Sequence, residues 1–269
     1  MQRTILARSG IEVSRIGLGL SRIHHLMFES DRARLIDKAR SVGITHFDVA
    51  RLYADGLAER SLGRAVRRVR SSVTIASKFG LLPNDWLGAI GSAARPWWAA
   101  RSILNRVRWS RWPRRSFTAD TMRRSLTQSL RLMQTDYLDV YFLHEPRLGD
   151  LDGNEELIDA MLRAKKLGQV RALGIAGADV GMHERFPGVF DVIQTGESNW
   201  DGMTATPDFT YGVLSASKHA IPPEVRRAAG VRHLLESALA RRPQGAVLLG
   251  TSKSGNLDVV TEIDWQRKK

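Results

Sequence analysis

Eight short apolar runs, separated by amphipathic stretches, constrain the fold of this chain more than any other feature of its sequence. Near-continuous apolar runs are typical of strands that are buried on both faces, as in parallel sheets. Strands that alternate with helical patterns favour βαβ units. Eight such units close into a (β/α)₈ TIM barrel, whose active sites lie at the C-terminal strand ends. We therefore predict one TIM-barrel domain over residues 1–269, with strands at 16–20, 46–50, 73–77, 137–143, 170–176, 189–194, 211–215 and 246–250.

The stretches between these runs carry the spacing and the end signals of helices. Ser30 is the expected N-cap of the first helix and Gly43 its end. Asn154, followed by two glutamates, is the expected N-cap of a later helix that ends at Gly168. Residue Pro223 is expected to open a last helix that runs to about residue 240. The expected inward-facing residues are Leu35, Ile36, Ala39, Val42, Leu62, Val66, Val69, Met122, Leu126, Leu130, Met133, Leu157, Ile158, Met161 and Leu162.

Two connections depart from this pattern. Residues 80–117 form a long insertion after the third strand, with five tryptophans and seven arginines against one acidic residue, Asp85. A loop of this length in a compact domain is usually a lid, a binding loop or a disordered segment. The sixth connection, residues 195–211, is long enough for a crossover but too short for a full helix. We expect one helical turn there at most.

Composition limits the classes of function. The chain has 269 residues, of which 43% are hydrophobic and 26% charged, as in soluble globular proteins. It has no cysteine, which excludes disulfides, thiol catalysis and cysteine-ligated metals. No apolar run approaches the ~18 residues of a membrane span, and the first residues, MQRTILARSG, lack the apolar stretch of a signal peptide. A cytoplasmic location is the expectation that fits these features.

Four polar residues at or just beyond the ends of predicted strands belong together chemically. Asp48 and Tyr53 occur in FDVARLY, Lys78 in IASKFG and His144 in YFLHEP. A phenol is a weak acid with a pKa of about 10. A nearby ammonium group favours the phenolate, which lowers that pKa and makes the proton available. An Asp–Lys pair or a histidine alone is often structural, but the set of four predicts a proton-donating site.

These motifs, in this order, resemble those of the aldo-keto reductase family over essentially the whole chain. The segment IGLGLS resembles the glycine motif of the family's first strand. FDVARLYADGLAERSLGRAV resembles its FDTAxxYG…E…LG segment, with Val49 in place of the usual Thr. IASKFG carries the family's Lys motif and TDYLDVYFLHEP its His motif, while VRALGIAG, DVIQ, TYGVLSA and LLGTSKSGNL match more loosely. The resemblance implies an NAD(P)(H)-dependent oxidoreductase that interconverts aldehydes, ketones or sugar lactols with alcohols. No metal site is expected, because the remaining histidines lack metal-ligand spacing.

The resemblance implies a role for each of the four residues. Tyr53 would be the general acid that protonates the substrate carbonyl oxygen, and Lys78 would lower its pKa. Asp48 would hold Lys78 through a charge-assisted hydrogen bond, and His144 would donate a hydrogen bond to the carbonyl. The chemistry agrees, because hydride addition builds negative charge on oxygen and donors aimed at that oxygen lower the barrier.

The resemblance also implies a nucleotide site, for NADP(H) in preference to NAD(H). Gln194 would bond the carboxamide and Tyr211 would stack on the nicotinamide ring. The usual Ser–Asn pair after the fifth strand is replaced by Ala176 and Gly177. Lys253 could meet a 2′-phosphate as a point charge, since Asn256 falls near the place of the family's clamping arginine. The other residues implied in the site are Gly212, Leu214, Gly250, Thr251 and Ser252.

The basic insertion leaves a second class of function open. The formal net charge is +13, and a basic protein can bind nucleic acid, an anionic membrane surface or an acidic substrate. A catalytically weak barrel that docks through the insertion is therefore the alternative, favoured by the missing Ser–Asn pair. The intact set of four favours an enzyme acting on a small carbonyl or alcohol, with no nucleic-acid partner expected. The sequence leaves the substrate, the reaction direction and the oligomeric state open.

The placement of the insertion is predicted from its aromatic residues. Burying one large aromatic side chain gains about 1.5–3 kcal/mol, so several are not expected to stay exposed together. We expect its apolar side, with Trp97 and Trp98, to cover the barrel mouth while the arginines face water. Cation–π docking to a partner and disorder are the alternatives.

Overall fold

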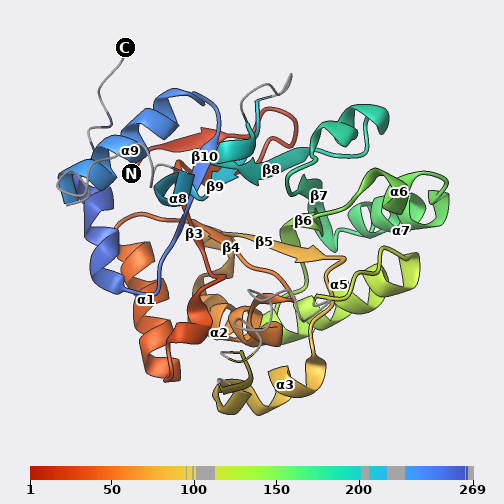
Figure 1. The fold of residues 1–269 in the computed structure, drawn as a ribbon, viewed down its shortest axis with the longest axis horizontal. Helices are drawn as coiled ribbons and strands as arrows, with labels where there is room; N and C mark the ends of the chain where they lie inside the picture. Colours follow the sequence, from red (N-terminus) through yellow and green to blue (C-terminus); the bar gives the residue numbers. More distant parts are fainter. Residues whose placement is uncertain are drawn as a thin grey trace.

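A closed barrel of eight parallel strands forms the centre of the molecule (Figure 1). The computed structural model describes residues 1–94, 96–98, 100, 113–200, 206–216, 228–263 and 265. Strand β10 pairs with both β9 and β3, which closes the barrel. The predicted (β/α)₈ fold is therefore confirmed. The barrel strands are β3 (Ile16–Gly19), β4 (His46–Asp48), β5 (Thr74–Phe79), β6 (Leu138–His144), β7 (Val170–Ala176), β8 (Val192–Gly196), β9 (Phe209–Tyr211) and β10 (Ala246–Gly250).

Helices surround the barrel and connect its strands (Figure 1). The longer ones are α1 (Glu29–Ser41), α2 (Leu57–Val66), α5 (Ala119–Met133), α7 (Glu155–Lys166) and α9 (Ala228–Ala240). The shorter ones are α3 (Asp85–Ile90), α6 (Leu148–Leu151) and α8 (Val213–Ala216). Single 3₁₀ segments are η1 (Ile23–His25), η2 (Tyr53–Gly56), η3 (Arg67–Ser72), η4 (Gly91–Ala94), η5 (Gly181–Arg185), η6 (Glu197–Asn199) and η9 (Ser254–Glu262).

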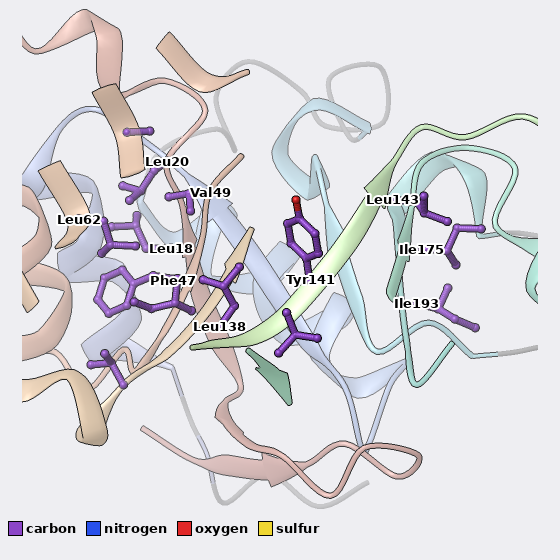
Figure 2. Packing of buried hydrophobic residues seen from close by; sticks show 14 of the residues in the cluster. Leu18, Leu20, Phe47, Val49, Leu62, Leu138, Tyr141, Leu143, Ile175 and Ile193 are labelled. Atoms are coloured by element: carbon purple, nitrogen blue, oxygen red, sulfur yellow. The ribbon is translucent and has the colours of Figure 1, made fainter. Parts of the chain in front are cut away.

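The main apolar core lies between the barrel wall and the helices. Phe47 of β4 and Leu62 of α2 are fully buried in one continuous cluster (Figure 2). Leu143, Ile175 and Ile193 occupy matching positions on β6, β7 and β8, and the register places each beside the next. Residues one position along the strand face the interior instead, because successive strand side chains alternate between faces.

A two-stranded antiparallel hairpin, which the sequence did not predict, precedes the barrel. It consists of β1 (Arg3–Ile5) and β2 (Glu12–Ser14). Its neighbours Leu6 and Ile11, with Val13, share an apolar cluster with Phe142 and Phe209 of the barrel strands. The hairpin therefore packs against the barrel interior and covers the end opposite to the C-terminal strand ends.

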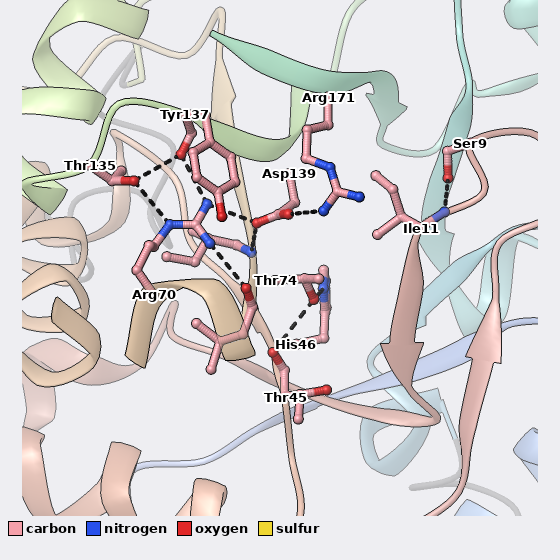
Figure 3. A network of polar contacts seen from close by, with 12 residues as sticks. Ser9, Ile11, Thr45, His46, Arg70, Thr74, Thr135, Tyr137, Asp139 and Arg171 are labelled. Carbon is pink, nitrogen blue, oxygen red and sulfur yellow. Dashed lines mark hydrogen bonds and ion pairs between the residues drawn. The ribbon is translucent and has the colours of Figure 1, made fainter. Parts of the chain in front are cut away.

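A polar network ties strand starts together at that same end (Figure 3). The buried carboxylate of Asp139, near the start of β6, accepts hydrogen bonds from Arg70 Nη2 at 2.8 Å and Arg171 Nη1 at 2.7 Å. It also accepts one from the backbone N–H of Ile75 at 2.8 Å. Because every partner lies on a different element, this network fixes β5, β6, β7 and η3 relative to one another.

The guanidinium group of Arg15 links the first barrel strand to the last helix. It is buried and donates four hydrogen bonds of 2.5–2.8 Å to backbone carbonyls at the C-terminal end of α9 and just beyond. These carbonyls belong to Leu239, Arg242, Pro243 and Gly245. A helix leaves its last carbonyls without intrahelical partners, and Arg15 satisfies the one that belongs to Leu239.

The seventh strand lies earlier than predicted. It ends at Tyr211, and Gly212 follows with a φ of 77°. Left-handed backbone at a glycine costs little and breaks the extended chain. The predicted strand residues 213–215 belong to the helix α8 instead, because a helical turn buries Val213 as well as a strand would.

Several expected helix details are also wrong. Helix α1 begins before Ser30, and its N-cap is Phe28 without a side-chain cap. Val69 falls in η3, beyond the end of α2. On α7, Leu162 is exposed, because the buried face of this helix runs along Leu157, Ala160, Met161 and Ala164.

Some of the other predicted helix ends agree with the structure and others do not. Asn154 is the N-cap of α7, but its side chain donates to the carbonyls of Phe117 and Asp150 rather than accepting a helix N–H. Gly43 and Gly168 follow their helices with positive φ as expected. Within the described part of the sixth connection, η6 forms a single turn. The expected start of the last helix at residue 223 lies outside the described residues.

Candidate active site

The four predicted catalytic side chains meet at the C-terminal end of the barrel. Asp48 and His144 are the last residues of β4 and β6, and Lys78 is the residue before the last in β5. Tyr53 opens η2, in the loop just beyond β4. Because β4, β5 and β6 are neighbours in one parallel sheet, their ends bring these groups to one place.

Lys78 is the centre of the group. Its Nζ lies 2.6 Å from both carboxylate oxygens of Asp48, 3.1 Å from the carbonyl oxygen of Val49 and 3.4 Å from the phenol oxygen of Tyr53. Lys78 and Asp48 are both buried. Burial lowers the pKa of Lys78, while the Asp48 charge opposes that change. The structure thus contains the Asp48–Lys78 contact that the sequence predicted.

The pKa of Tyr53 moves in the opposite direction to the expectation. Burial raises it well above 10, and the charges of Asp48, Tyr211 and Glu145 raise it further. The predicted lowering by Lys78 is outweighed, because removing the phenol from water penalises the phenolate and the Asp48 charge adds to that penalty. Tyr53 is therefore protonated at neutral pH, which is the state that a proton donor needs.

His144 stands edge-on to the Tyr53 ring. Their ring centroids are 5.8 Å apart and the ring planes meet at 84°. Burial lowers the pKa of His144 well below 6.5, and the positive charges of Lys78 and Arg115 lower it further. Its Nδ1 is buried without a hydrogen-bond partner in the described structure. The imidazole is thus neutral at pH 7 and can donate from one nitrogen.

These residues line a cavity of about 580 Å³ at the end of the barrel. The wall also contains Gln194 at the middle of β8, Tyr211 at the end of β9, and Gly250 at the end of β10. Gly212 and Leu214 line it from the α8 side. The replaced pair Ala176–Gly177 lines it as well. The predicted catalytic residues and five of the nine predicted cofactor residues therefore share one cavity.

Gln194 connects the predicted catalytic residues with the predicted cofactor residues. Its Nε2 donates to Asp48 Oδ1 at 3.0 Å, whereas its buried Oε1 has no hydrogen-bond partner in the described structure. A buried polar atom without a partner costs roughly 1–3 kcal/mol. An acceptor left unpaired in a cavity wall fits a ligand with an N–H donor, such as a carboxamide.

The other four predicted cofactor residues lie in the loop after β10 and do not line that cavity. Thr251 is buried, and its Oγ1 accepts hydrogen bonds from the backbone N–H of Lys253 at 3.0 Å and from Asn256 Nδ2 at 3.1 Å. Ser252 and Lys253 lie between Thr251 and η9. Asn256 therefore shapes this loop from within, a role that its sequence position did not indicate.

Sequence reasoning missed several residues of the cavity wall. Arg22 follows the first barrel strand and Glu145 follows His144 directly. Glu145 adopts a left-handed conformation with a φ of 56°, which is uncommon for a residue with a side chain. Both could have been predicted from their positions in the sequence, since each comes within three residues of a C-terminal strand end.

The base of the insertion closes on itself beside the cavity. The backbone N–H of Leu82 donates to Arg114 and that of Ser116 to Gly80, both at 2.8 Å. Leu81 and Pro113, at the two ends of the insertion, line the cavity. Arg115 donates to the Glu145 carbonyl at 2.8 Å and pairs with Asp150 at 2.7 Å. This arginine therefore does not simply face water.

The expectation for the tryptophans is only partly right. Trp98 is 5% exposed, whereas Trp97 is 57% and Trp86 70% exposed. Trp98 packs beside η2 and not in the cavity wall. Adjacent residues of a short helical stretch point in different directions, so only one of the pair can face the protein. Trp109 and Trp112 lie outside the described residues.

Among the helices that the structure describes, none is both long and apolar enough to span a membrane. Within the same residues, no group of three or more His, Cys, Asp or Glu side chains could hold a metal ion.

Comparisons with known proteins identify oxidoreductases as relatives of this chain. The chain is 25% identical over 309 aligned positions to L-galactose dehydrogenase of Arabidopsis thaliana, covering 96% of this chain and 88% of that protein. It is 30% identical to the aldo-keto reductase YhdN of Bacillus subtilis over 70% of this chain, and there spans about half of the relative, 51%. L-glyceraldehyde 3-phosphate reductase of Escherichia coli is 30% identical over 65% of this chain and 45% of its own length.

Solved structures share the fold. The holo form of an aldo-keto reductase from Bacillus halodurans has a TM-score of 0.74 at 18% identity, covering 97% of this chain and 90% of that one. A Klebsiella pneumoniae aldo-keto reductase, solved in complex with NADPH, has a TM-score of 0.72 at 19% identity, with coverages of 99% and 92%. The profile of the aldo/keto reductase family matches residues 15–194. This match, together with the barrel and the relatives, means that the chain belongs to the aldo/keto reductase family of oxidoreductases.

Proposed function

We propose that this protein transfers hydride between a nicotinamide cofactor, NADP(H) in preference to NAD(H), and a small carbonyl or alcohol, with Tyr53 as the general acid and base. One observation carries the proposal. The Lys78 ammonium group contacts Asp48 at 2.6 Å and the Tyr53 phenol at 3.4 Å in the wall of one cavity.

The proton chemistry follows from the charges around Tyr53. In the reduction direction, the protonated phenol donates to the carbonyl oxygen as negative charge develops there. The phenolate that remains lies beside Lys78, whose charge stabilises it. Asp48 holds the ammonium group in place, and neutral His144 donates a second hydrogen bond to the same oxygen.

The residues of the cavity fit a nicotinamide nucleotide. The unpaired Oε1 of Gln194 would accept from the carboxamide, and the half-exposed ring of Tyr211 would stack on the nicotinamide. The nicotinamide itself would supply the hydride. Gly212, Leu214 and Gly250 would border it, while the loop of Thr251, Ser252, Lys253 and Asn256 would hold the adenosine end. Two solved structures of similar fold, both of an aldo-keto reductase from Klebsiella pneumoniae, are complexes with NADPH or NADP, which supports the preference for the phosphorylated cofactor.

A small hydroxylated aldehyde or a sugar lactol is the substrate class that we propose. Ser21, Arg22 and Glu145 line the cavity together with Tyr53 and His144, so a substrate rich in hydroxyl groups finds both donors and acceptors. Two relatives are named for substrates of the same class, an L-galactose dehydrogenase and an L-glyceraldehyde 3-phosphate reductase.

Cofactor fluorescence and a substrate panel test the proposal together. NADPH and NADH are titrated with the protein, and small aldehydes, ketones and aldoses are then offered in both directions. We expect NADPH binding, turnover of a hydroxylated substrate, and a rate loss of ~10²–10⁴-fold in Tyr53→Phe with little change in cofactor affinity. Cofactor binding without any turnover, or a Tyr53→Phe variant that keeps more than half of the wild-type rate, contradicts the proposal.

A further inference from the structure

The loop that carries Tyr53 has an unusual backbone. Ala54, Asp55 and Gly56 follow it with φ values of 50°, 53° and 96°. A residue with a side chain rarely adopts positive φ, and each such residue costs on the order of 1–3 kcal/mol unless its surroundings hold it. Two of these three residues have side chains. Contacts from elsewhere must therefore stabilise this conformation.

The insertion supplies those contacts through Asp55. This carboxylate is only 2% exposed. Its Oδ1 accepts from the backbone N–H of Asn84 at 2.8 Å, and its Oδ2 accepts from the indole Nε1 of Trp98 at 2.7 Å. Charge-assisted hydrogen bonds to a buried carboxylate are strong. Asp55 thus joins the Tyr53 loop to two separate points of the insertion.

Helix α3 also packs directly on this loop. At Gly88, a Cβ atom would lie 1.9 Å from the carbonyl oxygen of Asp55, so only glycine permits the approach. Leu87, Ala94 and Trp98 of the insertion form a small apolar cluster with Ala54 and Leu57 that is distinct from the main core.

A second contact holds the other side of Tyr53. Arg51, two residues before it, is buried and forms an ion pair with Asp85, the first residue of α3. The same guanidinium group donates to the fully buried Glu59 at 3.2 Å. The insertion therefore contacts the chain both before and after Tyr53.

We propose that residues 84–94 and 96–98 of the insertion form a brace that sets the position of the Tyr53 phenol, and that Asp55 and Trp98 are positioning residues for proton transfer. The inference rests on the proposed role of Tyr53. It assigns to this part of the insertion an effect on the rate of the chemical step and not on the shape of the substrate cavity. A displacement of about 1 Å in a catalytic group can cost 10²-fold in rate, so loosening this loop acts on kcat.

Trp98→Phe tests the brace with little change in packing. It keeps an aromatic ring in the apolar cluster and removes the N–H that Asp55 accepts. The exposed neighbour provides the matched control, Trp97→Phe. We expect kcat for carbonyl reduction to fall by about tenfold in Trp98→Phe, with KM for substrate and cofactor within twofold of wild type and a larger deuteride isotope effect. Asp55→Asn should show the same kcat and KM pattern. An unchanged kcat in Trp98→Phe overturns the inference.

Hydrogen exchange gives a readout that does not need turnover. The backbone N–H groups of Tyr53 and Asp55 donate to Ala50 and Leu52 at 3.0 and 3.2 Å. We expect these two amides to exchange at least tenfold faster in Trp98→Phe and as in wild type in Trp97→Phe. If the wild type reduces no substrate, the proposed function fails while exchange still decides the brace. Unchanged exchange in Trp98→Phe overturns it even if kcat falls.

Discussion

Lys78 donates hydrogen bonds to both carboxylate oxygens of Asp48 at 2.6 Å. The negative charge of the carboxylate therefore offsets part of the positive charge that Lys78 presents to the Tyr53 phenol. The phenol lies 3.4 Å from the ammonium group, and its pKa is raised by burial. Burial and the Asp48 charge thus keep Tyr53 protonated before the reaction, and Lys78 offers a cation beside the phenolate after it.

Replacing Lys78 with Met should slow the oxidation direction most. That direction requires the phenolate, and loss of the ammonium group raises the pKa of Tyr53 further, so the rising limb of the pH–rate profile should move to higher pH. We expect a rate loss of ~10²-fold or more near neutral pH. An unchanged pH profile would make Lys78 a structural partner of Asp48 alone.

The control for Lys78→Met is a double variant. Removing one member of a buried ion pair leaves an uncompensated charge and costs about 3–5 kcal/mol of stability. Lys78→Met with Asp48→Asn removes that charge. The double variant should recover stability in urea unfolding without recovering oxidation activity.

Gln194→Leu should weaken cofactor binding while leaving proton transfer in place. Gln194 lines the cavity, and leucine removes its buried, unpaired acceptor Oε1 and also the donor to Asp48. One hydrogen bond is worth about 0.5–1.5 kcal/mol, so the Kd for NADPH should rise by roughly three- to tenfold. Tyr211→Phe keeps the aromatic face and serves as the control, with Kd unchanged. Equal NADPH titrations for Gln194→Leu and wild type would exclude Gln194 from the cofactor site.

Gly63→Ala should destabilise the fold at the contact between α2 and α5. An added Cβ would lie 2.3 Å from the backbone oxygen of Met133 and 2.4 Å from its Cα. Backbone cannot yield as a side chain does, and overpacking costs about 1–3 kcal/mol. The matched control is Gly149→Ala, since a Cβ there meets nothing within 4 Å. Urea midpoints measured for both variants check the prediction, which fails if the two are equally stable.

His46 should make the fold sensitive to acid. Burial lowers the pKa of His46 to about 3, and the Lys78 charge adds to this; its ring bonds Thr74 at 2.9 Å (Figure 3). Because the unfolded histidine titrates near 6.5, the unfolded chain binds a proton between pH 6.5 and 3 that the folded chain excludes. The free energy of unfolding therefore falls as the pH falls through that window.

The free energy of unfolding plotted against pH has a slope in this window, and His46→Gln should reduce that slope by ~1.4 kcal/mol per pH unit. Urea unfolding at pH 7, 5.5 and 4.5 measures it, with His183→Gln, a half-buried histidine of η5, as the control. A wild-type slope that persists in His46→Gln would show that other groups carry the acid sensitivity.

Strand positions and the shared location of Asp48, Lys78 and His144 could be predicted because parallel strands leave a strong apolar pattern and their C-terminal ends meet at one edge. The placement of Tyr53 depends on more than pattern. Ala54 takes positive φ, although nothing in its side chain favours that conformation.

Other features escaped prediction for physical reasons that can be named. The strands of the N-terminal hairpin have three residues each, too few for a periodic signal. Trp97 and Trp98 are identical and adjacent, and contacts with residues distant in the sequence, including the hydrogen bond to Asp55, distinguish the buried one. The direction of the Tyr53 pKa shift also needed the structure, because it depends mainly on how deeply the phenol is buried.

The hydrogen bonds from Arg15 to carbonyls as far along the chain as Gly245, 230 positions away, have a consequence for synthesis. Strand β3 leaves the ribosome long before its partner β10 is made. Until then β3 and β9 both present unpaired edges, and exposed edges favour association with other chains. Closure over so long a loop is slow, so the nascent chain depends on protection of these edges until residue 250 has emerged.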